Sequence, residues 1–150
     1  MPQSLANVLL HLVFSTRDRI PLISAEIEPE LHAYMATIFN ESECPALLIN
    51  GANDHVHILF ALTRTSTIAD IVNRVKSNSS KWIKTKDAPF FPFAWQAGYG
   101  VFSVGQTDRE RVMKYIENQK VHHQKQTFVD EYRDMLRRAR IEFDERYVWD

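Results

Sequence analysis

The chain has 150 residues, of which 45% are hydrophobic and 25% charged, and this composition suits one globular domain with a buried core. Its net charge of −1 gives no indication of a polyanionic partner for the protein as a whole. The single cysteine, Cys44, excludes an internal disulfide framework and favours a reducing cytoplasm. The sequence shows neither an apolar run as long as a membrane span nor the pattern of a secretory signal at its start. We therefore expect a cytoplasmic protein with a single domain over residues 1–150 and no membrane partner.

The first half of the chain predicts three strands and one helix. The apolar run 8–14 indicates a buried central strand, and residues 24–40 show the pattern of a helix capped by Ser24. A short strand over 46–50 leads into Asn50-Gly51, which is a typical turn signal. A further apolar strand follows over 54–62.

The second half predicts three helices and one more strand. The sequence Thr67–Asp70 fits a capping box for a helix that extends to about residue 84. A strand is expected over 99–104. Thr107–Glu110 fits a second capping box, which would begin a helix that continues through His122. A last helix is expected from about 128 to 140, followed by an extended tail.

This order of elements predicts an α+β fold. We expect one antiparallel sheet with helices packed on one face, close to a ferredoxin-like or RRM-like sandwich. The other face of such a sheet can remain open for a nucleic acid. The C-terminal helix and tail, about residues 127–150, would pack on this domain or on a partner subunit.

Two histidines lie in the strand Asp54-His55-Val56-His57-Ile58-Leu59-Phe60. Side chains alternate along a strand, so His55 and His57 share one face at a separation of roughly 6–7 Å. Two imidazoles placed in this way can bind one divalent cation. The same pattern also fits two half-exposed histidines with hydrogen-bonded rings, so the pair needs partners before it indicates a metal site.

Tyr115 and Gln119 are candidates for those partners. They lie four residues apart on an expected helix and would therefore share a face. The amide oxygen of Gln119 is a hard ligand that suits Mg²⁺ or Mn²⁺ together with two imidazoles. The phenol of Tyr115 could then attack a phosphodiester that the cation polarises. Without the histidines, a packing tyrosine and a solvated glutamine would explain these residues equally well.

A local excess of positive charge covers the helix expected after Thr67. Between Arg64 and Lys86 there are six basic residues and one acidic residue, Asp70. Such a segment attracts phosphate backbones, although a charge run is more commonly a solvated helix face. The candidates for DNA contacts are Arg64, Arg74, Lys76, Lys81 and Lys84.

The sequence resembles a known family, the single-tyrosine HUH transposases of small bacterial insertion sequences. The name HUH describes the pattern of a histidine, a hydrophobic residue and a histidine. The resemblance covers nearly the whole chain and rests on these segments: His11–Thr16, Asp54–Leu59, Val75–Trp82, Phe93–Ser103, Tyr115–Gln119 with His122-His123, and Phe143–Trp149. Gln119 favours the mobile-element branch over the repeat-associated branch, which carries asparagine at this point of its pattern.

The resemblance implies a function and a role for each matching residue. Tyr115 would be the nucleophile that forms a 5′-phosphotyrosine with single-stranded DNA. His55, His57 and Gln119 would hold Mg²⁺ or Mn²⁺. Such enzymes cut and rejoin single strands at element ends marked by hairpins, and they act as homodimers whose active sites can be shared between subunits. His122 and His123 match the family without an assigned chemistry.

A second hypothesis is a non-catalytic or domesticated protein that binds single-stranded or hairpin nucleic acid. It gives no reason for two histidines together with a tyrosine and a glutamine. The aromatic–basic strand motif of common single-strand binders is also absent from the sequence. An assay for covalent protein–DNA adducts separates the two hypotheses.

Overall fold

The computed structural model describes residues 2–150, and its centre is a four-stranded antiparallel sheet in the order β2-β3-β1-β4. The strands are β1 (Leu9–Ser15), β2 (Ala46–Ala52), β3 (His55–Ala61) and β4 (Gly100–Val104). The helices are α1 (Glu28–Glu41), α2 (Ile68–Ile83), α3 (Arg109–Glu117), α4 (Gln119–His122) and α5 (Phe128–Arg138). The order of strands and helices confirms the predicted α+β fold with an antiparallel sheet.

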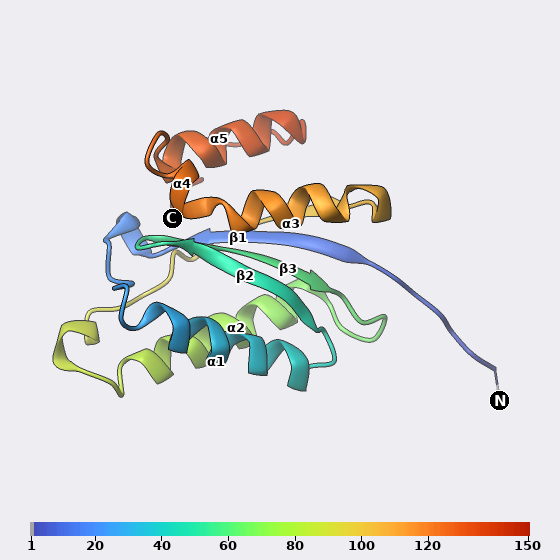
Figure 1. Cartoon of the computed structure of the whole chain (residues 1–150), viewed down its shortest axis with the longest axis horizontal. Coiled ribbons are helices and arrows are strands. Elements are labelled where there is room, and N and C mark those ends of the chain that lie inside the picture. The colour runs from blue at the N-terminus through green and yellow to red at the C-terminus, as the bar shows by residue number, and fades with distance from the viewer. Residues whose placement is uncertain (1) are drawn as a thin grey trace.

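One face of the sheet packs against α1 and α2, and this layer forms the main hydrophobic core (Figure 1). The central strands β1 and β3 send every second side chain to this face, as strand alternation requires. The helices contribute apolar side chains such as Leu31 and Met35 from α1 and Val75 from α2, all of them fully buried. The strand residues of this core are Leu10, Leu12, Phe14, Val56, Ile58 and Phe60.

The opposite face of the sheet is covered by α3, α4 and α5, as Figure 1 shows. The expectation that this face remains open is therefore wrong. α3 buries Ile116 against Leu9 and Leu59 of the sheet, and α5 buries an apolar stripe that begins at Phe128. Amphipathic helices of this kind gain stability by burying their apolar side, so they close over the sheet.

Gly100 of β4 determines how closely α5 approaches the sheet. A Cβ atom at Gly100 would lie 2.6 Å from Cε1 and 2.8 Å from the hydroxyl of Tyr132 in α5. The ring of Tyr132 is held between Phe128 and Trp149, with ring centroids 5.5 and 5.8 Å away. The absence of a side chain at Gly100 thus lets this ring, and with it α5, rest on the strand.

The two predicted capping boxes have different outcomes. The side chain of Thr67 accepts a hydrogen bond from the backbone N–H of Asp70 at 3.1 Å, so the first cap is confirmed. The second is wrong, because Thr107 lies in a 3-10 turn and α3 begins only at Arg109. The expected single helix through His122 also breaks at Asn118, where ψ changes to 14°.

The hairpin between β2 and β3 turns three residues later than expected. Asn50-Gly51 lies inside β2, and the turn consists of Asn53 and Asp54, because Ala52 already pairs with His55. Gly51 is needed for a close approach, since a Cβ atom there would lie 2.2 Å from the carbonyl oxygen of His55. The hairpin therefore places His55 directly after a tight turn.

The C-terminal tail is not extended as predicted. Phe143, Val148 and Trp149 pack against the cluster around α5. The backbone N–H of Gly98 donates to the carbonyl oxygen of Asp150 at 2.8 Å, so the tail reaches back to the segment before β4. Within residues 2–150, no helix is long and apolar enough to cross a membrane.

Candidate active site

His55 and His57 face the layer formed by α3, α4 and α5. Both side chains are completely buried, so they are not the half-exposed histidines of the alternative interpretation. They lie on the same face of β3, as the alternation of a strand predicts, and their ring centroids are 5.2 Å apart.

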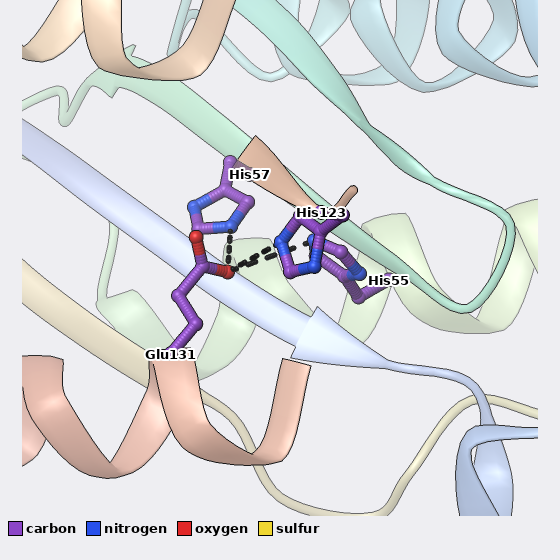
Figure 2. Close-up of side chains that lie close together, drawn as sticks. All are labelled: His55, His57, His123 and Glu131. Carbon is purple, nitrogen blue, oxygen red and sulfur yellow. Dashed lines mark hydrogen bonds and ion pairs between the residues drawn. The ribbon is translucent and has the colours of Figure 1, made fainter. Parts of the chain in front are cut away.

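Glu131 of α5 lies at the centre of this cluster, as Figure 2 shows. Its Oε1 atom is 2.8 Å from Nε2 of His57, 3.0 Å from Nε2 of His123 and 3.7 Å from Nε2 of His55. Glu131 is only 1% exposed. A buried carboxylate is costly unless polar groups surround it, and here three imidazoles converge on one of its oxygens.

The structure also brings Tyr115 and Gln119 to this cluster, although the helix between them is broken. The hydroxyl of Tyr115 donates a hydrogen bond to Oε2 of Glu131. The amide nitrogen of Gln119 donates to the same oxygen at 3.1 Å, and its amide oxygen lies 3.1 Å from Nε2 of His55. The ring centroids of Tyr115 and His57 are 5.7 Å apart, all within one chain.

Two further side chains contact the Nδ1 atoms of His55 and His57, which face away from the cluster. Oδ1 of Asp54 lies 2.7 Å from Nδ1 of His55, and Nε2 of His11 lies 2.8 Å from Nδ1 of His57. Metal-binding histidines usually have such a partner on the nitrogen that faces away from the ion. Both Nε2 atoms are thereby directed into the cluster.

The donor atoms of this cluster fit a divalent cation. Asp54 accepts from Nδ1 of His55, so a neutral His55 ring presents a lone pair at Nε2. That lone pair faces the amide oxygen of Gln119, and the amide nitrogen of Gln119 is already used in a hydrogen bond to Glu131. Acceptors that face one another need a shared proton or a cation between them. His55, His57 and Gln119, with His123 and Glu131 beside them, form a suitable set of nitrogen and oxygen ligands.

The electrostatic environment favours the forms of these groups that bind metals. Burial lowers the pKa of His57 to about 4, although its hydrogen bond to Glu131 opposes this shift. Burial, together with the nearby His57, lowers the pKa of His11 to about 3, so both rings are neutral near pH 7. Burial acts to raise the pKa of Glu131, but hydrogen bonds from His123 and His57 outweigh it and hold that pKa far below its usual range.

Tyr115 is held as a neutral phenol. Burial raises the pKa of Tyr115 well above its usual value, and the negative charge of Glu131 raises it further. The phenol lies beside a cleft of about 380 Å³ between β4, α3 and α5. The lining of this cleft includes His11, Phe102, Arg111 and Arg138. The cleft gives the site a route to the surface that two arginines flank.

The predicted DNA contacts lie elsewhere. α2 packs on the opposite face of the sheet, so its basic residues do not surround Tyr115. Lys76 is occupied within the protein, because its ammonium group donates to the carbonyl oxygens of Gln96 at 2.8 Å and Gly98 at 2.6 Å. Burial lowers the pKa of Lys76 to about 8. The other four candidates are exposed: Arg64, Arg74, Lys81 and Lys84.

Sequence reasoning missed Glu131 and left His123 without a role. A signal for Glu131 was present, since it lies on the same side of α5 as Phe128, Tyr132 and Leu136, all of which are buried. A charged residue within an apolar stripe needs a polar partner in the core. That requirement would have directed attention to the histidines.

The chain belongs to a transposase family. Residues 4–119 match the family described as "Transposase IS200 like", which confirms the resemblance predicted from the motifs. Among proteins of known identity, the chain is 24% identical over 114 residues to the ISDra2 transposase TnpA of Deinococcus radiodurans. This match covers 73% of this chain and 81% of that protein.

Solved structures share the fold. A crystal structure of a protein from Deinococcus radiodurans R1 has a TM-score of 0.62 at 23% identity, and the match covers 79% of this chain and 98% of that one. A REP-associated tyrosine transposase bound to a REP hairpin has a TM-score of 0.62 at 12% identity and covers 82% of this chain and 72% of that one. The family match ends at Gln119, so His123 and Glu131 lie beyond it.

Proposed function

We propose that this protein is a DNA transposase that cleaves and rejoins single-stranded DNA at hairpin-marked ends through a 5′-phosphotyrosine on Tyr115. The observation that carries the proposal is the position of the Tyr115 hydroxyl, which lies in one buried cluster with His55, His57 and Gln119. Membership of the transposase family and the hairpin bound by a similar structure support the same substrate.

The chemical step transfers a phosphodiester from DNA to the tyrosine. The phenolic oxygen of Tyr115 forms a bond to the phosphorus, and the bond between that phosphorus and the 3′ oxygen breaks. The phenolic proton leaves on the side of Oε2 of Glu131, which already accepts it in a hydrogen bond, and the departing 3′ oxygen gains a proton. Rejoining is the reverse step, in which a 3′ hydroxyl attacks the phosphotyrosine and releases the phenol.

His55, His57 and Gln119 would hold Mg²⁺ or Mn²⁺ beside this phenol. When bound, the cation would polarise the scissile phosphate and offset the negative charge that develops on it. The protein itself keeps His57 neutral by burial and orients the rings of His55 and His57 through Asp54 and His11. Burial of the cluster also limits access of water, which would otherwise compete with a DNA hydroxyl for the phosphotyrosine.

We propose that two surfaces contact DNA. The cleft beside Tyr115, with Arg111 and Arg138 in its lining, suits a single strand that must bring one phosphate to the phenol. The exposed cations of α2 and Arg64 suit the backbone of a hairpin on another side of the protein. Lys76 is the exception, because its ammonium group is bound to backbone carbonyls.

The proposal includes a homodimer in which each subunit uses its own tyrosine. Tyr115 lies against the histidine pair of its own chain, so one subunit contains the complete set. Mixing Tyr115→Phe subunits with His57→Ala subunits tests this point. Mixed dimers should form no adduct if each site is built from one chain, whereas adduct formation would show that the tyrosine serves the partner's histidines.

An adduct assay tests the function as a whole. The protein is incubated with single-stranded DNA that carries a hairpin, with Mg²⁺ or Mn²⁺, and is then analysed on a denaturing gel. Wild type should form a covalent protein–DNA species, and Tyr115→Phe should form none. Hairpin binding without an adduct in wild type would favour the domesticated or non-catalytic binding protein, and an adduct in Tyr115→Phe would place the nucleophile elsewhere.

A further inference from the structure

We infer that His123 and Glu131 complete the cation site, and that the carboxylate of Glu131 joins the bound cation to Tyr115. This inference rests on the proposed function, because it concerns the same site. It adds two ligands that lie beyond the family match and come from the C-terminal part of the chain.

The geometry of four side chains supports a shared ion. One ligand atom from each of His55, His57, His123 and Glu131 lies within 4.8 Å of all the others. Adjacent ligands of one cation, each about 2.1 Å from it, are about 3.0–3.4 Å apart in octahedral or tetrahedral sites. The separations of 2.8, 3.0 and 3.7 Å between Oε1 of Glu131 and the three imidazoles span this range.

The two oxygens of Glu131 have separate surroundings. Oε1 faces the three imidazoles, as the dashed lines in Figure 2 show, whereas Oε2 accepts hydrogen bonds from Tyr115 and Gln119. A cation bound through Oε1 would leave Oε2 in place to hold the phenol. α5 thereby fixes the distance between the nucleophile and the cation, which the broken helix at Asn118 alone would leave less constrained.

The ligand types predict which ions bind. Three imidazoles, one carboxylate and the amide oxygen of Gln119 supply three nitrogen and two oxygen ligands. Sites with several imidazoles favour Mn²⁺ and later transition metals over Mg²⁺, which prefers oxygen ligands and keeps several waters. We therefore expect Mn²⁺ to bind the protein in the absence of DNA, and Mg²⁺ to bind far more weakly under the same conditions.

A structural role for Glu131 is the rival explanation. In that case the carboxylate would serve only as the acceptor for buried imidazoles, and cation binding would depend on His55, His57 and Gln119 alone. The two explanations differ in what removal of the charge of Glu131, or of the ring of His123, does to Mn²⁺ affinity.

Calorimetric titration of the full chain with Mn²⁺, without DNA, tests the inference. Glu131→Gln and His123→Gln should each lower Mn²⁺ affinity by at least about tenfold, since loss of even an outer partner of a metal ligand costs about 10–100-fold. The matched controls are His32→Gln in α1, on the opposite side of the sheet, and Glu142→Gln in the exposed tail. Both controls should bind Mn²⁺ like wild type.

A second readout tests the link to the nucleophile. Mn²⁺ should shift the tyrosine absorbance of wild type, and Tyr115→Phe should lose that shift although it still binds Mn²⁺. Circular dichroism of each variant shows whether it is folded. Wild-type affinity in folded Glu131→Gln and His123→Gln overturns the inference and leaves the proposed function intact.

The remaining outcomes separate the inference from the function. Wild-type Mn²⁺ affinity in folded His57→Ala would contradict both, because it would place the ion outside the histidine cluster. Mn²⁺ binding that is lost in Glu131→Gln, in a wild-type protein that forms no DNA adduct, would support the inference and refute the function. Equal binding of Mg²⁺ and Mn²⁺ by wild type would contradict a site with several imidazoles.

Discussion

The two faces of the sheet differ in what they bury. The face under α1 and α2 buries a continuous apolar core, and Lys76, which is partly buried at this side, is held by the protein's own carbonyl groups. The face under α3, α4 and α5 buries imidazoles, an amide and a carboxylate between small apolar clusters. Buried polar groups cost stability, so their concentration on one face marks it as the functional side, while the other face supplies the stability.

The largest expected effect on the functional face comes from His57→Ala. Adduct formation should fall by more than about 100-fold, because this change removes a proposed direct ligand of the cation, and loss of even an outer partner of a metal ligand costs about 10–100-fold. Hairpin affinity should mostly remain, since it rests on cationic and shape contacts. The two measurements are the denaturing-gel assay and a DNA titration. Loss of DNA affinity together with activity would mean that the histidines serve the fold.

The matching change on the apolar face is Leu31→Ala. Leu31 is fully buried in α1, so the free energy of unfolding should fall by about 2–5 kcal/mol, as measured by urea denaturation. The Mn²⁺ affinity of the folded protein should be unchanged, because α1 lies on the opposite side of the sheet. A matching drop in Mn²⁺ affinity would show that the two faces are coupled.

A smaller effect separates the two candidate DNA surfaces. Arg138→Ala should weaken single-strand binding by about fivefold and reduce the dependence of binding on salt by about 0.7 in logarithmic slope, since one phosphate contact is lost. Lys76→Met also removes one positive charge, but its salt slope should equal that of wild type because Lys76 is already bound to carbonyls. A reduced salt slope in Lys76→Met, together with a wild-type slope in Arg138→Ala, would place the single strand on the α2 face.

The smallest effects come from the two threonine caps. Thr67 caps α2 and Thr127 caps α5, each through a hydrogen bond to the backbone three residues later. Replacement of either by alanine should cost about 1 kcal/mol in thermal or urea unfolding. Only Thr127→Ala should also lower Mn²⁺ affinity, by about fivefold or less, because Glu131 lies in the first turns of α5 and moves when that end frays. Equal Mn²⁺ affinity in both variants would argue against a role for α5 in the site.

The sequence predicted the features of the fold that depend on short-range residue patterns. Alternation along β3 placed His55 and His57 on one face, and the capping box at Thr67 marked the start of α2. The turn at Asn50-Gly51 was misplaced because Gly51 is required for a close approach between strands, which a turn propensity does not describe.

The parts that could not be predicted depend on packing between distant segments. The apolar stripe around Glu131 indicates that this carboxylate needs a polar partner, but it does not show that α5 folds over His57 of β3, 74 residues earlier in the chain. The role of His123 depends on the helix break at Asn118, which changes the direction of the chain before it. The basic character of α2 was read correctly, but the face of the sheet that it covers follows only from the complete topology.

The contact between Gly100 and Tyr132 has a consequence for protein engineering. A methyl group at position 100 would overlap the ring of Tyr132, which cannot move aside because Phe128 and Trp149 enclose it. α5 would have to shift outward, and Glu131, the residue directly before Tyr132, would shift with it. Side chains of increasing size at position 100 thus offer a graded control of the geometry of the proposed active site from a remote position that changes none of its proposed ligands.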